Sequence, residues 1–403
     1  MAFAQKTSAA GASQDSDPIR VMVVDDAVVI RGLLTRWLDE APGLTVVSSQ
    51  RNGKLAVDDI LKSNPDVVVL DIEMPEMDGM TALPLMLAKK RDLVVIMAST
   101  LTRRNAEISL KALSLGAADY VPKPESTSEV TTSVDFRREL IDKVKALGLR
   151  ARRLRGPAHR MRAETTAGRT AAAPVPASRL PDTREAFRGA VKPVAPAATA
   201  FKLRPYSSAK PRILAIGSST GGPQALQVVM KVIGTAIQDV PVVITQHMPP
   251  TFTAILAEHV GKAALRPAAE GKDGDVLQPG HIYVAPGGKH MVLEKDGGAV
   301  KIRLNDNPPV NFCKPAVDPL FDSVAKIYGS ATLGLILTGM GHDGADGVRT
   351  IAAGGGSIIT QDEASSVVWG MPGAAAQTGM CSDVLPLSEI GPKISRVLKG
   401  NTR

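Results

Sequence analysis

The sequence of 403 residues lacks the marks of secreted, disulfide-bonded and membrane proteins. It has only two cysteines, Cys313 and Cys381, and neither has a Cys or His nearby at metal-ligand spacing, which argues against a disulfide framework and suits a reducing compartment. No apolar run approaches the roughly 20 residues of a membrane span, and the N-terminus lacks the apolar stretch of a signal peptide. Aromatic residues make up only 3%, so any core must be built from Val, Ile, Leu, Ala and Met. We therefore expect a cytoplasmic protein of two or three domains, without membrane insertion.

Excess positive charge is confined to one stretch of the chain. The net charge is +8, but residues 150–212 alone carry +12, which leaves the remainder at −4. This stretch is rich in Ala, Pro and Arg and has no apolar periodicity, so it cannot bury enough surface to fold. We predict a long, disordered basic linker over 148–209 and a disordered N-terminal extension over 1–18. The linker is either a solvated tether or a contact for an acidic partner or nucleic acid. No helix-turn-helix follows it, so we expect no nucleic acid partner.

Residues 19–147 alternate short apolar runs with helix-length segments. The runs IRVMVVDD, LTVVSS, DVVVLD, LVVIMAS and ADYVPKP are β-branched and largely unalternated, as is typical of parallel strands buried on both faces. Five such units predict a doubly wound parallel sheet, with the working site at the carboxyl ends of its strands.

Polar residues mark those strand ends. Asp25 and Asp26 end the first strand, Asp71 the third, Ser99 the fourth and Lys123 the fifth. Clustered carboxylates favour a hard cation such as Mg²⁺, beside which a carboxylate can attack a phosphoryl group. The Lys123 ammonium and the Ser99 hydroxyl would then hold the phosphoryl oxygens. Acids at strand ends also commonly cap the next helix, so the pair Asp25–Asp26 alone decides little.

The full set is more specific, because VVDD, LDIEMPEMDG, MAST and YVPKP occur in order and resemble the response-regulator receiver domain. The resemblance implies a flavodoxin-like fold in which Asp71 takes phosphate from a histidine kinase. It implies Mg²⁺ on Asp26 and Asp71, helped by Asp25 and the backbone of Glu73. It also implies roles in switching for Ser99, Tyr120 and Lys123.

From Arg212 onwards a second alternation of strands and helices begins. RILAIGS, VPVVITQ, TLGLILTG and GSIITQ are apolar strand candidates, and PQALQVVMKVIG and TFTAILAEHVGK are helix candidates. HIYVAPGG and HMVLEKDGGAVKIRL between them are interpreted as an antiparallel ribbon. We predict a second parallel-sheet α/β domain over 210–400.

Three strand ends of this domain carry candidate catalytic groups. Ser219 is the centre of a G-x-S-x-G turn between a strand and a helix, which suits a nucleophile, although such a turn could also cradle a phosphate or be a plain turn. His247 follows the next strand and can act as general base, although a lone histidine is more often structural, and His342 competes for the role. Asp343 can orient a histidine or simply cap the next helix. The chain order Ser…His…Asp disfavours the α/β-hydrolase fold.

Together, GSSTGGPQAL, ITQHMPPTFT, HIYVAPGGKHM, LTGMGHDGADG and TQDEASSVVWGMPGAA closely resemble the catalytic domain of the CheB chemotaxis methylesterases. The resemblance implies a Rossmann-like three-layer fold and a triad of Ser219, His247 and Asp343, with oxyanion donors near Thr220 and Met340. It implies hydrolysis of glutamate methyl esters, and of glutamines, on chemotaxis receptors, with no cofactor for the esterase chemistry. A chemotaxis histidine kinase would be the phosphodonor, and the enzyme would be recruited to receptor arrays. We expect the receiver to cover the active site until Asp71 is phosphorylated. An esterase or amidase for another substrate would carry the same triad.

Overall fold

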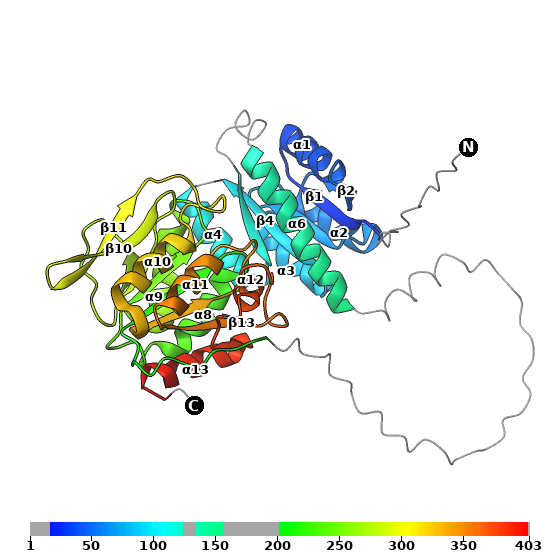
Figure 1. Ribbon diagram of the computed structural model, residues 1–403. Coiled ribbons are helices and arrows are strands. Elements are labelled where there is room, and N and C mark those ends of the chain that lie inside the picture. The colour runs from blue at the N-terminus through cyan, green and yellow to red at the C-terminus, as the bar shows by residue number, and fades with distance from the viewer. Residues whose placement is uncertain (1–16, 101, 124–133, 156–200, 402–403) are drawn as a thin grey trace, which may run out of the picture.

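The computed structural model describes residues 17–100, 102–123, 134–155 and 201–401, which form two parallel-sheet α/β domains (Figure 1). This confirms the predicted fold class of both domains. All but two residues of the expected N-terminal extension, and residues 156–200 of the expected linker, lie outside the described residues. None of the described helices is long and apolar enough to cross a lipid bilayer.

The first domain is a five-stranded sheet in the order β2-β1-β3-β4-β5, with every neighbouring pair parallel. The central strand β3 is buried along its whole length, and β1 is buried except at Arg20, as their β-branched sequences predict. The strands are β1 (Ile19–Val24), β2 (Leu44–Gln50), β3 (Val67–Asp71), β4 (Val94–Thr100) and β5 (Asp119–Lys123). The helices are α1 (Val28–Asp39), α2 (Gly53–Ser63), α3 (Gly79–Lys89), α4 (Arg103–Ser114) and α6 (Val134–Arg155).

Helix α6 continues past residue 147, where the first domain was expected to end. The helix can pack closely there because Gly148 has no side chain: a Cβ on it would come within 2.7 Å of Ile19. One turn further on, the Arg152 guanidinium pairs with the Asp66 carboxylate at 2.7 Å. On the far side of the linker, the Tyr206 hydroxyl donates to Asp383 at 2.6 Å. The expected linker is therefore shortened at both ends, because its flanks bond to the domains.

The second domain is a seven-stranded sheet in the order β14-β13-β12-β6-β7-β9-β8, also parallel throughout. The chain starts at the central strand β6, builds outwards to one edge, and then crosses back to β12. The strands are β6 (Ile213–Ser218), β7 (Val242–Gln246), β8 (Ala268–Glu270), β9 (Ile282–Val284), β12 (Thr332–Ile336), β13 (Ser357–Gln361) and β14 (Asp383–Leu385). The helices are α8 (Gly222–Ile233), α9 (Phe252–Ala264), α10 (Val317–Tyr328), α11 (Ala345–Ala353), α12 (Met371–Gln377) and α13 (Leu387–Leu398), with a 3₁₀ turn η2 (Gly329–Ala331).

One strand assignment in this domain was wrong. The segment HIYVAPGG was expected in an antiparallel ribbon, but β9 pairs in parallel with β7 and belongs to the main sheet. Only β10 (His290–Asp296) and β11 (Ala299–Asn305) form the ribbon. The three residues of β9 are all buried, so this short apolar run has the burial of a central strand rather than of an exposed ribbon.

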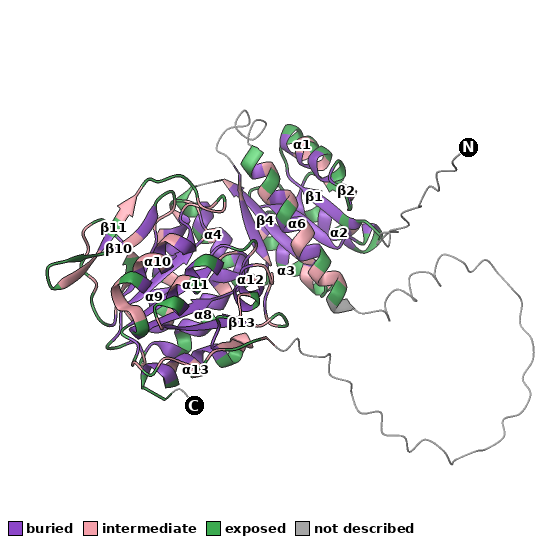
Figure 2. Cartoon of the chain, in the orientation of Figure 1, coloured by how far each residue is buried: buried purple, intermediate pink, exposed green. Residues whose placement is uncertain are grey.

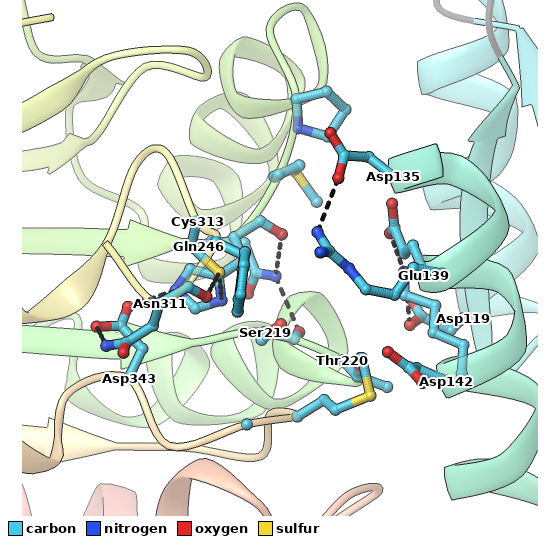
Figure 3. Close-up of a pocket in the computed structure, with 18 of the residues that line it drawn as sticks. Asp119, Asp135, Glu139, Asp142, Ser219, Thr220, Gln246, Asn311, Cys313 and Asp343 are labelled. Carbon is cyan, nitrogen blue, oxygen red and sulfur yellow. Dashed lines mark hydrogen bonds and ion pairs between the residues drawn. The ribbon is translucent and has the colours of Figure 1, made fainter. Parts of the chain in front are cut away.

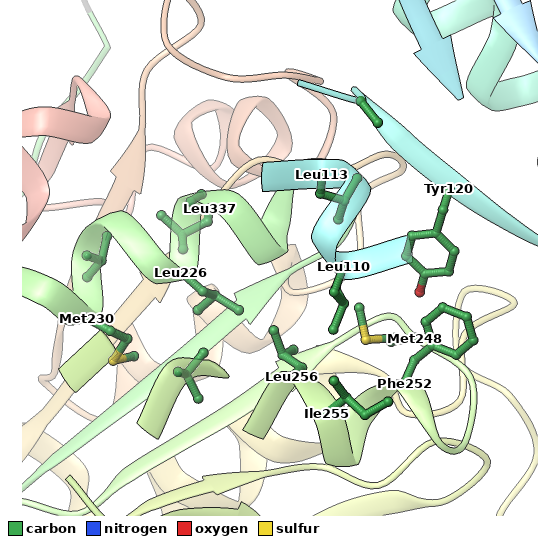
Figure 4. Close-up of a cluster of buried hydrophobic side chains, with 14 of the residues drawn as sticks. Leu110, Leu113, Tyr120, Leu226, Met230, Met248, Phe252, Ile255, Leu256 and Leu337 are labelled. Atoms are coloured by element: carbon green, nitrogen blue, oxygen red, sulfur yellow. The ribbon is translucent and has the colours of Figure 1, made fainter. Parts of the chain in front are cut away.

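One cluster of buried apolar side chains includes residues of both domains. Figure 2 shows how buried residues are distributed over the helices and strands of each domain. Leu110 and Leu113 of α4 belong to the same cluster of buried side chains as Leu226 of α8 and Ile255 of α9 (Figure 4). Helix α4 contacts both α8 and α9. The first domain is therefore docked on the second through apolar surface, which water would otherwise cover.

Candidate active site and phosphorylation site

Three carboxylates gather at the carboxyl edge of the first sheet, between β1 and β3, where the strand order reverses. Ligand atoms of Asp25, Asp26 and Asp71 lie within 4.8 Å of one another. Asp25 and Asp71 are buried, whereas Asp26 is exposed. An all-oxygen cluster open on one side has the donor set that Mg²⁺ takes, since this ion prefers a few carboxylates and retained waters.

Lys123 supplies the positive charge of this cluster. Its ammonium lies 2.7 Å from Asp71 Oδ1 and 3.1 Å from Asp25 Oδ2. Burial raises the pKa of Asp71 to about 6, and the Asp25 charge adds to the rise, against the lowering effect of Lys123. Three carboxylates and one ammonium give the site a net negative charge, which the binding of a cation or of a proton would reduce.

The other expected receiver residues lie on the same edge. Ser99 is buried, and its Oγ lies 2.9 Å from Ser109 Oγ of α4. Glu73 is exposed in the loop after β3. Tyr120 points out of its domain: its ring stacks on Phe252 of α9, with centroids 4.7 Å apart and planes at 8°. The phosphorylation edge and the domain interface are thus joined through β5.

Ser219 sits in the sharp turn between β6 and α8. Gly221 makes the turn possible, because residues that have a Cβ rarely adopt its backbone φ of 76°. Ser219 is partly exposed, whereas its neighbour Ser218 is fully buried and donates to Gln246 Oε1 at 2.7 Å. Of the two serines, only Ser219 can meet a substrate.

His247 and Asp343 come together from the ends of β7 and β12. His247 Nε2 lies 2.7 Å from Asp343 Oδ2. Burial opposes protonation of His247, but the hydrogen bonds to Asp343 and Cys313 outweigh it and raise the pKa to about 10. Burial also opposes ionisation of Asp343, yet the contact with His247 lowers its pKa to about 2. Asp343 is therefore a carboxylate, and Nε2 carries the hydrogen that it accepts.

Asp343 caps α10, which precedes it in the chain, and not the helix that follows it. Its carboxylate accepts from Val317 N at 2.6 Å and from Asp318 N at 3.2 Å, the first two backbone amides of α10. The helix α11 after it has Gly344 at its N-cap, without a side-chain cap. A helix N-terminus favours a negative charge, so α10 holds Asp343 ionised opposite His247.

The remaining nitrogen of His247 faces a thiol. Nδ1 lies 3.3 Å from Cys313 Sγ, and among the described residues no hydrogen bond joins the Ser219 hydroxyl to His247. His342, the competing histidine, is exposed and does not take this place beside Asp343. The structure thus brings Ser219, His247 and Asp343 to neighbouring strand ends, with the serine and the base not yet bonded.

Two backbone amides close to Ser219 are free to bind an oxyanion. Within the described residues, neither Thr220 N nor Met340 N donates to any acceptor. The loop carrying Met340 approaches Ser219 closely because Gly339 has no side chain: a Cβ there would lie 2.9 Å from Ser219 Cβ. The expected donors are therefore adjacent to the expected nucleophile.

The site opens into a cleft of about 750 Å³ whose opposite wall is the first domain. Figure 3 shows Asp119, Asp135, Glu139 and Asp142 facing the labelled catalytic-domain residues across it. The Arg138 guanidinium lies 4.5 Å from the ring centroid of Phe312. Residues of the first domain therefore lie opposite Ser219 across this cleft.

Sequence reasoning missed several residues of the site. Cys313 carried no motif and was noted only for its lack of metal-ligand neighbours. Asn311 Nδ2 donates to Asp318 and Asp343, at 3.1 and 3.3 Å. Gln246 was quoted beside His247, but its bonds to the backbone of Ser219 and His247 were not foreseen. The buried polar Gln at a strand end was the one available signal.

Comparison with known proteins agrees with these observations. Residues 21–135 match the response regulator receiver domain family, and residues 214–394 match the CheB methylesterase family. A Bradyrhizobium diazoefficiens protein named protein-glutamate methylesterase/protein-glutamine glutaminase of group 2 operon is 55% identical over 401 residues, covering 98% of each chain. A Rhodopseudomonas palustris protein-glutamate methylesterase/protein-glutamine glutaminase is 54% identical over the whole of both chains. The crystal structure of the Thermotoga maritima CheB methylesterase catalytic domain is 37% identical, with a TM-score of 0.45, and covers 47% of this chain and 100% of its own.

Proposed function

The chain belongs to the family of CheB methylesterases with a response-regulator receiver domain, and from this premise we propose that it is a phosphorylation-activated serine hydrolase of chemotaxis receptors. Its substrates are γ-methyl esters of receptor glutamates, and the products are methanol and the free carboxylate. The observation that carries the proposal is the convergence of Ser219, His247 and Asp343 on one sheet edge beside two free backbone amides. This proposed activity would take place in the cytoplasm, at the receptor arrays.

Each group has a chemical role in the proposed reaction. Ser219 Oγ attacks the ester carbonyl while His247 Nδ1 takes its proton, and Asp343 holds the imidazolium through Nε2–H. The amides of Thr220 and Met340 bind the oxyanion. The tetrahedral intermediate collapses as His247 returns the proton to the departing methoxide, giving methanol and an acyl-serine. Water, deprotonated by His247, then releases the glutamate and regenerates Ser219.

A receptor glutamine would follow the same path. Its amide carbonyl gives the same oxyanion, and His247 protonates the leaving nitrogen, so ammonia departs in place of methanol. The names of the relatives include both activities.

Control is proposed to begin at Asp71, which accepts a phosphoryl group from a histidine kinase. Asp25, Asp26 and Asp71 would hold Mg²⁺, which neutralises charge at the phosphoryl group when bound. Lys123 already contacts Asp71 and would bind a phosphoryl oxygen, with Ser99 as the hydroxyl partner. Tyr120, which stacks on Phe252, would link phosphorylation of Asp71 to the domain interface.

The domain arrangement supports inhibition by covering. The receiver forms one wall of the cleft over Ser219, and docking buries apolar side chains of α4. Phosphorylation can activate only if it favours a receiver state that docks less well.

The test is methanol release from membranes bearing methylated receptors, with and without a small-molecule phosphodonor and Mg²⁺. We expect the wild-type chain to release methanol faster with the phosphodonor, Asp71→Ala to ignore it, and Ser219→Ala to release none. Hydrolysis of unrelated esters but not of receptor esters would leave a serine hydrolase with another substrate. Undiminished activity in Ser219→Ala would refute the mechanism.

A further inference from the structure

A tight turn beside the triad has an uncommon backbone. Val310 and Cys313 exchange backbone hydrogen bonds of 3.1 and 2.8 Å, and the two residues between them, Asn311 and Phe312, have φ values of 52° and 63°. Positive φ at two successive residues defines a hairpin turn that usually carries glycine, and a bulky Phe adopts it at a cost. Contacts on both sides of the turn must therefore hold it in place.

On its inner side the turn is bonded to the triad. Cys313 Sγ lies 3.3 Å from His247 Nδ1, and the Asn311 side chain donates to Asp343. Asp343 engages the other ring nitrogen of His247. The turn thus contacts both His247 and Asp343, whereas among the described residues Ser219 makes no hydrogen bond to His247.

On its outer side the turn touches the receiver. Phe312 is 82% exposed, and the Arg138 guanidinium of α6 lies over its ring. Arg138 is held in turn by Asp135 at 2.8 Å on the same helix. A cation over an aromatic face is an attractive contact, so the docked receiver stabilises the turn.

These contacts conflict with catalysis. Because Asp343 is a carboxylate and accepts from Nε2–H, the nitrogen of His247 left for catalysis is Nδ1, which has a single hydrogen-bonding position. Whether that position holds a hydrogen or a lone pair, it can engage the Cys313 sulfur or the Ser219 hydroxyl, but not fully both. When His247 turns away, the thiol can donate to the Asn311 carbonyl, 3.5 Å from Sγ, so its release leaves no orphaned donor.

We propose that Cys313 is a positioning residue that keeps His247 from Ser219 while the receiver is docked, and that the Arg138–Phe312 contact transmits docking to it. The inference rests on the proposed function, because it assumes that Ser219 and His247 must pair. It adds a second level of inhibition: the cleft is covered, and the catalytic pair beneath it is also unassembled.

The first test compares Cys313→Ala with Cys313→Ser in the full chain. Cys313→Ala should raise methanol release without phosphodonor about fivefold, the equivalent of about 1 kcal/mol for one hydrogen bond, and change the stimulated rate less. Cys313→Ser, whose hydroxyl can still donate to Nδ1, should stay closer to the wild type. An unchanged activation ratio in Cys313→Ala overturns the proposal. So does a loss as complete as that of Ser219→Ala, which would make the thiol essential to the chemistry.

The second test asks whether Arg138 acts through Cys313. Arg138→Gln should also raise the unstimulated rate, and combining it with Cys313→Ala should add little, because both remove one linkage. Arg137→Gln is the matched control, since Arg137 is equally exposed on the same helix but pairs with Glu40. Fully additive effects, or an equal rise in Arg137→Gln, overturn the transmission through Phe312.

A third measurement needs no substrate, so it separates failure of this inference from failure of the proposed function. In the full chain labelled with ¹⁵N-histidine, Cys313→Ala should shift the Nδ1 signal of His247 without phosphodonor. With phosphodonor and Mg²⁺ the same substitution should shift it much less. A Nδ1 signal that ignores Cys313 in the unphosphorylated chain means that the contact is not made, whatever the receptor assay gives.

Discussion

Leu110 offers a direct way to measure how strongly the receiver is docked. Its side chain is 2% exposed and belongs to the cluster that joins α4 to the catalytic domain. Replacing a buried leucine with alanine costs about 2–5 kcal/mol, and less where the surroundings can relax. Leu110 also packs within its own domain, so we assign about 1–2 kcal/mol of this cost to docking. At 1.4 kcal/mol per tenfold, the ratio of docked to undocked receiver should fall by about 5–30-fold.

The expected result of Leu110→Ala is therefore a rise in the unstimulated rate of methanol release, towards the rate that the wild type reaches with phosphodonor. The activation ratio should fall accordingly. The assay is initial methanol release from methylated receptor membranes, with a urea titration to check that the receiver remains folded.

Leu34→Ala is the control for general damage to the receiver. Leu34 is 1% exposed in α1 and belongs to a different cluster of buried residues. It should lower the stability of the receiver by a comparable amount without raising the unstimulated rate. If Leu34→Ala activates as strongly as Leu110→Ala, the release comes from unfolding of the receiver. If Leu110→Ala is folded and stays as inactive as the wild type, apolar docking does not set the inhibition.

Three further outcomes are expected. Because the bond to Asp343 opposes the effect of burial and raises the pKa of His247, and the base must be neutral, the unstimulated rate should rise with pH until His247 has lost its proton. Asp343→Asn should lower the maximal rate and move this rise to lower pH, and a rise that stays in place would contradict the pairing. Asp71→Asn should stabilise the Mg²⁺-free receiver by at most about 3 kcal/mol near pH 7.5, because a carboxylate whose pKa rises to about 6 on folding costs stability when ionised. The gain in stability should vanish below about pH 4, where Asp71 is protonated in both the folded and the unfolded state. Thermal unfolding of both proteins at several pH values measures the gain, and a gain that persists at pH 4 would contradict the prediction. His342→Ala should keep most of the activity in the methanol assay, since His342 is exposed and Asp343 engages His247 instead.

The sequence predicted the two sheets well because buried parallel strands leave a strong signal. Every long apolar run that was expected to be a strand of a sheet is one, and the polar residue after each falls on the shared edge. The short segment of β9 was misplaced, because three apolar residues are compatible with either a ribbon or a parallel strand. Its partner β7 is about 40 residues away in sequence, and only the folded chain shows that pairing.

The residues of the site also divide into those that strand patterns predict and those that only the folded chain brings together. Ser219, His247 and Asp343 follow strands, so the topology alone predicts that they meet. Cys313 and Asn311 lie in the loop between β11 and α10, and nothing in their local sequence indicates that the chain returns them to His247. Contacts made by loops depend on packing between distant segments, which no local pattern encodes.

The domain interface places two distinct obstacles before the reaction. The apolar face of α4 sets how often the cleft is open, while the turn around Phe312 keeps His247 from Ser219 as long as the cleft is closed. The two are coupled because α4 and α6 belong to one receiver. A receptor helix that enters must displace α6 from the turn, and that same displacement removes Arg138 from Phe312. Transient undocking of the receiver would then expose the cleft and release His247 from Cys313 in one event. Because this coupling is reciprocal, loss of the Cys313 contact also favours undocking, and the unstimulated rate measures the undocked fraction.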